Sequence, residues 1–104
     1  MEIKRNERGF LTGQFTDRYD KKCSIQKSSL AFEDCIWLGI DDPEPKIMAK
    51  DASRLGLLTQ EDTGWIDYPL PNEVLVHTRM HLTREQVKDL LPTLTKFVET
   101  GEIL

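Results

Sequence analysis

The residues of this chain best suited to ligand chemistry are Trp37 and Arg79. An arginine presents five N–H donors in a planar fork that matches phosphate and carboxylate groups, and an indole ring is a platform on which a nucleobase stacks. Alternation along the predicted strands places both residues on one face of a sheet, as a polar surface with a large aromatic ring at its centre. The other residues predicted on this face are Ser24, Gln26, Cys35, His77 and His81.

Two cysteines and two histidines raise the question of a metal site. Structural zinc sites take their ligands in close pairs such as C-x₂₋₄-C, whereas Cys23 and Cys35 are separated by eleven residues and are predicted on opposite faces. His77 and His81 share a face but lie about 13 Å apart along a strand. The sequence therefore predicts no metal site, and in a reducing cytosol we expect two free, partly buried thiols.

The sequence also lacks a pattern for catalysis. Nucleophilic catalysis needs a nucleophile, a base within hydrogen-bond reach and an orienting group, and no strand-to-helix elbow presents Cys23 or Cys35. The carboxylates at 41–44 and 61–62 stand beside prolines and polar residues, as is typical of solvent-exposed turns. Glycines are too sparse for a phosphate-binding loop. We therefore predict a protein that is not an enzyme, with no catalytic residues and no cofactor.

The clearest structural element is at the C-terminal end. Thr83 and Gln86 have the spacing of a capping box, and apolar residues follow at helical spacing up to Val98. Gly101 is typical of the residue that ends a helix. These signals predict a helix over 84–100, bent near Pro92 because proline removes a backbone hydrogen bond.

Alternating apolar and polar residues predict strands before this helix. They cover 14–18, 22–26, 35–40 and 74–82, with a short turn between the first two. The sequence thus predicts an α+β fold, an antiparallel sheet of about four strands with one C-terminal helix packed on one face. We expect a single domain over 1–104, with a loop or lid insertion at about 43–73 that Trp65 and Tyr68 hold over one end of the sheet.

Composition limits the classes of function. The 104 residues include 14 Lys and Arg against 18 Asp and Glu, a net charge of −4, which argues against binding nucleic acid by charge alone. No apolar run reaches the ~20 residues of a membrane helix, and the first residues lack the pattern of a signal peptide. We therefore expect a cytoplasmic protein without a membrane partner.

Three interpretations of the polar face remain open from the residues alone. In the first, Arg79 and Trp37 bind a nucleotide-like anion, a single nucleic-acid strand or another protein. In the second, Trp37 belongs to the core and Arg79 forms one salt bridge with a loop carboxylate. In the third, the face closes a homodimer and buries Trp37 symmetrically.

An ordered series of motifs resembles a family of small proteins found in bacteriophage and prophage genomes. The series consists of Phe15–Tyr19, Cys23–Gln26 with Ser28 and Ser29, Ile36–Gly39 and Arg79–Val87. The resemblance spans roughly 13–103, with 43–73 as its variable loop, and implies an accessory protein that acts by binding. Core packing and capping explain many of these residues, but not Asp17, Ser28 or Ser29, which favours a binding site near that edge of the sheet.

Together these observations predict a non-catalytic accessory protein of phage type in the cytoplasm of a bacterial host. The expected activity is inhibition of a host defence or regulatory protein, for which the mild acidity suits a basic surface such as a nucleic-acid-binding groove. The alternative is a sponge that sequesters a nucleotide signal. The candidate ligand- or partner-binding residues are Gln26, Ser28, Ser29, Trp37, His77, Arg79 and His81.

Overall fold

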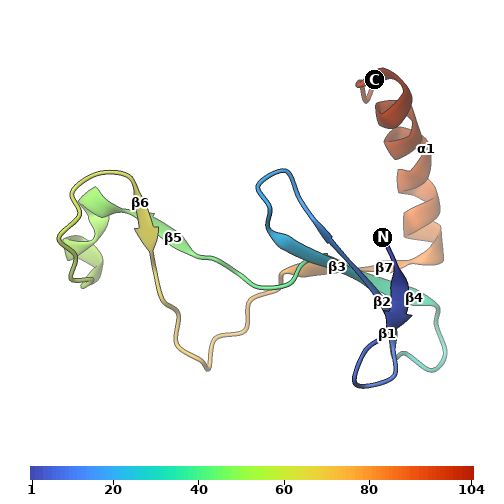
Figure 1. Cartoon of the computed structure of the whole chain (residues 1–104), viewed down its shortest axis with the longest axis horizontal. Helices are drawn as coiled ribbons and strands as arrows, with labels where there is room; N and C mark the ends of the chain where they lie inside the picture. Colours follow the sequence, from blue (N-terminus) through green and yellow to red (C-terminus); the bar gives the residue numbers. More distant parts are fainter. The chain divides into compact units, whose positions relative to one another are not determined.

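The computed structural model of the protein describes residues 1–104 (Figure 1). The chain forms two compact units, which are described separately. The sheet unit comprises residues 1–41 and 78–104, and the insertion unit comprises residues 42–77. None of the helices combines the length and the apolar composition that a membrane-spanning helix requires.

The sheet unit contains one antiparallel sheet of five strands in the order β1-β2-β3-β4-β7. The strands are β1 (Ile3–Arg5), β2 (Leu11–Thr16), β3 (Lys22–Lys27), β4 (Cys35–Ile40) and β7 (Arg79–Thr83). The α+β class is therefore confirmed. The strand β1 was not predicted, because its three residues alternate too briefly to be recognised in a sequence.

The turn between β2 and β3 confirms the predicted hairpin. The carboxylate of Asp17 accepts hydrogen bonds from the backbone N–H groups of Tyr19, at 2.8 Å, and of Lys21, at 3.0 Å. Asp20 adopts a left-handed conformation with φ of 62°, which aspartate tolerates. Asp17 thus has a structural role as the residue that fixes this turn.

The predicted strand over 74–82 is too long at its N-terminal end. In the structure β7 begins at Arg79, whose partner in β4 is Gly39. The strand β4 ends one residue later, at Ile40, and the chain turns away at Asp41. Residues 74–78 therefore alternate in polarity without a neighbouring strand to pair with, and they form no regular element.

The helix α1 (Arg84–Thr100) has the predicted bounds, and it continues through Pro92. Thr83 caps it: its hydroxyl accepts from the N–H of Gln86 at 3.2 Å, and the side-chain oxygen of Gln86 accepts from the N–H of Thr83 at 2.9 Å. Gly101 ends the helix in the left-handed conformation. Both predicted caps are confirmed.

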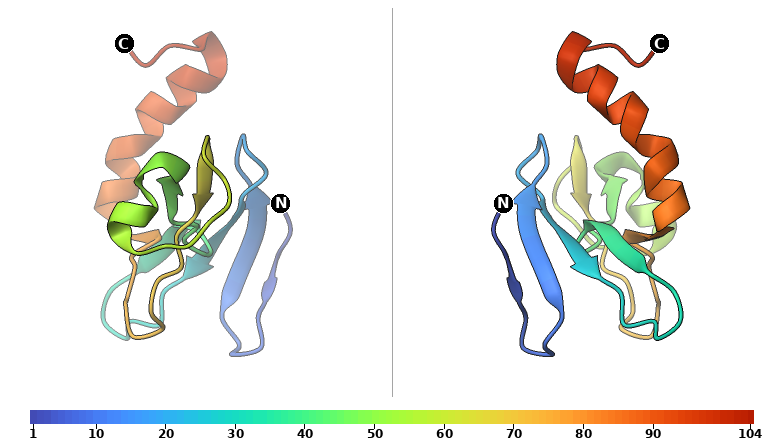
Figure 2. Two further views of the ribbon diagram at one scale, coloured as in Figure 1. Left: turned by 90° about the vertical axis from the view of Figure 1, so that its left-hand side faces the viewer. Right: turned by 90° about the vertical axis from the view of Figure 1, so that its right-hand side faces the viewer.

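The predicted packing of the helix differs from the structure. The helix leads away from the end of β7, and beyond its first turn it does not lie across the sheet (Figure 2). No residue of α1 is buried, and Met80, which pairs with Leu38 in the sheet, is 54% exposed. The amphipathic pattern predicts which side of a helix is apolar but not what that side contacts.

The two sheet faces differ in chemistry as the alternation predicts. The register sets Ile25, Leu38 and Met80 side by side on an apolar face, and Gln26, Trp37 and His81 side by side on the opposite face. The sheet unit has a small core. Its buried hydrophobic residues are Cys23 and Cys35, and the larger side chains of Ile25, Ile36, Leu38 and Ile40 are only half-buried.

The insertion unit contains two short strands, β5 (Lys46–Met48) and β6 (Trp65–Asp67), paired antiparallel. Between them are two 3₁₀ turns, η1 (Ala49–Asp51) and η2 (Ser53–Leu55). Gly56 ends η2 in a left-handed conformation. Ile47, Ala49 and Ala52 are buried and form the small core of this unit.

Candidate functional site

The face of the sheet that carries Trp37 has no acidic residue in any of its strands. Because antiparallel partners share a face, the register defines its members. We call this surface the polar face, and its residues are Lys4, Thr12, Gln14, Thr16, Lys22, Ser24, Gln26, Cys35, Trp37, Gly39, Arg79, His81 and Thr83. It carries two lysines and an arginine and is locally basic, although the whole chain has a net charge of −4.

Trp37 and His81 form the centre of the polar face. They are direct partners across the β4–β7 pair, and their rings stack with centroids 3.9 Å apart and planes 9° from parallel. Trp37 is half-buried, whereas His81 is exposed. Cross-strand pairing holds the two rings in one orientation, which lowers the entropy that a ligand or partner must remove.

Arg79 lies beside the same indole. Its guanidinium carbon is 5.7 Å from the centroid of the Trp37 ring, within the range of a cation–π contact. Its Nη1 donates to the hydroxyl of the buried Ser24 over 3.4 Å. No carboxylate forms an ion pair with Arg79, so its remaining donors are available to an anion. In the sheet unit this arrangement differs from the interpretation with a core Trp37 and a salt-bridged Arg79, because Trp37 is half-buried and Arg79 has no carboxylate partner there.

Ser28 supports His81 from the end of β3. Its hydroxyl oxygen is 3.0 Å from Nε2 of His81 and also accepts from the N–H of Leu30 over 3.3 Å. Ser28 is buried, and its backbone N–H donates to the carbonyl of Cys35. Ser28 thus orients the histidine and fixes the β3–β4 turn, which is the structural role that the sequence did not reveal.

Of the three other predicted site residues, Gln26 lies on the polar face, whereas Ser29 and His77 lie outside its strands. Gln26 is half-buried and lies next to Trp37 in the register, on the β3 side. Ser29 is exposed in the β3–β4 turn and its side chain forms no hydrogen bond. His77 precedes β7 and belongs to the insertion unit, so its prediction as a neighbour of Arg79 on the polar face is wrong.

Both cysteines are free and buried, on opposite faces of the sheet as predicted. Burial raises the pKa of the Cys23 thiol, with smaller contributions from the carboxylates of Asp17 and Asp41. Burial likewise raises the pKa of Cys35, and Glu33 adds to the effect. A raised pKa reduces the thiolate fraction, so neither thiol has the properties of an activated nucleophile. No group of three or more potential ligands is arranged to hold a metal ion.

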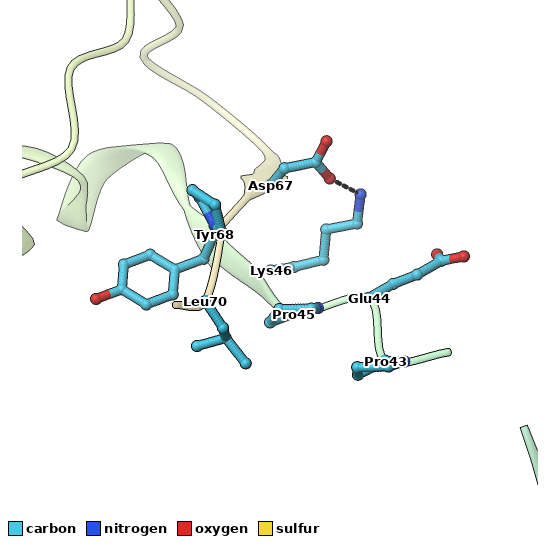
Figure 3. A pocket seen from close by; sticks show the side chains of 8 residues that line it. Pro43, Glu44, Pro45, Lys46, Asp67, Tyr68 and Leu70 are labelled. Atoms are coloured by element: carbon cyan, nitrogen blue, oxygen red, sulfur yellow. Dashed lines mark hydrogen bonds and ion pairs between the residues drawn. The ribbon is translucent and has the colours of Figure 1, made fainter. Parts of the chain in front are cut away.

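The insertion unit has an open pocket of about 520 Å³ between the ends of β5 and β6 (Figure 3). Pro43, Pro45 and Leu70 supply apolar surface, and the ring of Tyr68 lies on the same side as Leu70. Lys46 and Asp67 form an ion pair at the rim. Because these two charges neutralise each other, the pocket lacks the unpaired charge that Arg79 provides on the polar face.

No protein-family model, no curated protein and no solved structure matches this chain. The arrangement of its own residues therefore carries the functional argument. The cluster formed by Ser24, Ser28, Trp37, Arg79 and His81 is the site that the structure brings together.

Proposed function

We propose that the protein is a non-catalytic binding protein of phage or prophage type, which inhibits a host defence or regulatory protein in the bacterial cytoplasm. The observation that carries the proposal is the unpaired guanidinium of Arg79 beside the indole of Trp37. Tryptophan and arginine are the residues most enriched among those that dominate protein interfaces. The resemblance to phage proteins supports the cellular context.

The shape of the site supports a protein partner. Small-molecule sites are concave and bury most of their ligand, whereas the Trp37–His81 pair lies on a sheet face with His81 exposed. An open face with a fixed aromatic pair suits the surface of another protein.

The charge of the polar face defines the partner further. Lys4, Lys22 and Arg79 meet no acidic residue within the strands of this face. An acidic partner surface complements it better than the basic groove that the net charge of the chain suggests. We therefore infer that a carboxylate of the host protein pairs with Arg79.

Two pairs of matched variants test the proposal. Tagged protein is incubated with bacterial lysate, and the retained host protein is then purified for calorimetry. Trp37→Ala and Arg79→Ala are expected to weaken binding by about 30-fold or more, the loss that defines a dominant interface residue. Trp65→Ala and Arg54→Ala remove exposed residues of the same types from the insertion unit and are expected to leave affinity unchanged.

The circular dichroism spectrum of each variant shows whether the sheet is retained. If no host protein is retained at any salt concentration, or if the polar-face variants bind as tightly as the controls, the inhibitor proposal is wrong.

A nucleotide-like anion is the second candidate ligand, and the same unpaired Arg79 favours it. The guanidinium would bind a phosphate while the base stacks on the Trp37–His81 pair. Native mass spectrometry of gently purified protein detects such a ligand as an added mass of a few hundred daltons. Arg79→Ala is expected to abolish that added mass without lowering the melting temperature. A parallel loss of stability would make Arg79 a structural residue instead.

A further inference from the structure

The helix α1 exposes an apolar stripe along its whole length. Val87, Leu90, Leu94 and Phe97 follow the alternating spacing of three and four residues of a coiled-coil seam, and two further residues widen the seam. In the single chain the exposed fractions are 44% for Leu90, 56% for Leu91, 55% for Leu94, 55% for Phe97 and 83% for Val98. We call these six residues the α1 stripe.

Within the sheet unit, no other element buries the α1 stripe. Helices of this length are only marginally stable alone in water, and Pro92 removes one of the hydrogen bonds of α1. Most helical stability in proteins comes from burying the apolar side. Pro92 lies on the side opposite the α1 stripe, where it does not obstruct such a contact.

We propose that a second copy of this chain covers the α1 stripe, with the two helices antiparallel. The exposed parts of these side chains amount to on the order of 500 Å² per copy, so that the pair would bury about 1,000 Å² in total, the lower limit for a specific interface. An isologous contact needs a self-complementary surface, which an apolar stripe provides.

The polar residues beside the stripe support a copy of the same chain. One border of the stripe consists of Gln86, Thr93 and Thr100, which are uncharged and bring no like charges together. An antiparallel pair centred on the middle of the stripe sets Arg84 of one copy at the height of the second copy's Glu102. It also opposes the two helix dipoles, which is favourable.

The ends of the helices agree with the same register. A hollow of about 370 Å³ lies at the base of α1 and is lined in part by Ile36, Leu82 and Val87. In the antiparallel register the second copy's Ile103 lies at the height of Leu82. Ile103 is 72% exposed in the single chain, and the hollow gives it an apolar contact.

This dimer differs from one closed by the polar face. Its seam uses α1, so Trp37, Arg79 and His81 stay open in both copies. The dimer through α1 does not rest on the proposed function. Each dimer would present two equivalent polar faces to a binding partner.

The mass of the protein in solution tests the dimer. Sedimentation equilibrium at micromolar concentrations is expected to give twice the chain mass of 12.0 kDa. Leu94→Glu places a charge in the seam and is expected to give the single-chain mass, with a weaker helical circular dichroism signal. Lys96→Glu introduces the same residue on the outer side of α1 and is expected to leave the dimer intact. If the wild-type protein has the mass of a single chain, the proposal is wrong. In that case the insertion unit of the same chain is the segment that covers the α1 stripe.

Cross-linking tests the orientation without disturbing the seam. Thr93 lies near the two-fold axis of the antiparallel pair, so Thr93→Cys is expected to form a disulfide-linked dimer under mild oxidation. The two copies of Thr100 lie about 20 Å apart along the axis in this arrangement, so Thr100→Cys is expected to stay unlinked. Equal linking of both variants, or linking of neither, overturns the antiparallel arrangement.

Discussion

Gly39 in β4 lies directly opposite Arg79 in β7. Its φ of +152° is a conformation that side chains rarely adopt, and a Cβ atom there would lie 2.6 Å from the carbonyl oxygen of Thr78 and 2.9 Å from the Cα of Arg79. The absence of a side chain therefore allows β7 to approach β4 closely at the residue that carries the guanidinium. The position of Arg79 beside Trp37 depends on this glycine.

Gly39→Ala is expected to lower the free energy of unfolding by about 2–3 kcal/mol, because the new methyl group meets backbone atoms that cannot move aside cheaply. Gly9→Ala is the matched control: Gly9 also has a positive φ, of +86°, but no atom lies within 4 Å of its added Cβ. Its cost is expected to be about 1 kcal/mol. Urea denaturation measures both, and equal costs would show that close approach at Gly39 does not matter.

The local elements of this fold were predictable because their signals are short-range. The capping box of Thr83 and Gln86, the left-handed Gly101 and the alternation of Cys35–Ile40 each depend on residues within a few positions of one another. The division of Trp37 and Leu38 between two faces follows from the same alternation. These features need no knowledge of what lies beside the strand or helix.

Apart from the short strand β1, the features that the sequence did not reveal depend on contacts between elements. The start of β7 depends on where β4 ends, and this removes His77 from the polar face. The Trp37–His81 stack and the Ser28–His81 hydrogen bond require the register between three strands. Only the pairing of whole strands sets that register, so no local pattern could have shown it.

The stack of His81 on Trp37 is expected to contribute about 1 kcal/mol to folding, as cross-strand aromatic pairs do. His81→Ala removes the stack, whereas His81→Phe keeps a flat ring. In a Trp65→Phe background, in which emission reports Trp37 alone, the alanine variant is expected to shift the emission to longer wavelength. Urea midpoints measure the stability. If the phenylalanine variant is as unstable as the alanine variant, the hydrogen bond to Ser28 matters more than the stack.

Asp34 links the β3–β4 turn to the strand β3 and to the helix α1. Its carboxylate accepts a hydrogen bond from Lys27 at 2.8 Å and lies 3.8 Å from the guanidinium of Arg84. The hydrogen bond from Lys27, followed by the charges of Lys27 and Arg84, lowers the pKa of this carboxyl. The folded protein therefore binds this proton less readily than the unfolded chain does.

A lowered pKa stabilises the fold above the pKa of the unfolded carboxyl, and the gain is lost as the pH falls through the lower value of the folded protein. The urea midpoint of the wild type is thus expected to exceed that of Asp34→Asn at pH 7, and the difference is expected to shrink as the pH falls below about 4, the pKa of an unperturbed aspartate. Asp62→Asn, at an exposed loop residue with no ion pair, controls for the change of charge. A difference that stays constant with pH would show that the ion pair is not its source.

The two thiols are expected to react slowly in the folded protein, because each is only 4–5% exposed and has a raised pKa that keeps it protonated at neutral pH. Labelling with a chromogenic disulfide reagent at pH 8 is expected to be at least about tenfold slower than in urea, and to accelerate with rising pH as the thiolate fraction grows. Cys23→Ser and Cys35→Ser assign the rate to each thiol. If either thiol reacts as fast as in urea, its side of the sheet opens to solvent. For Cys35 that side is the polar face at the Thr83 end of β4, so fast labelling that a bound partner slows would place the partner near Cys35 and its neighbour Trp37.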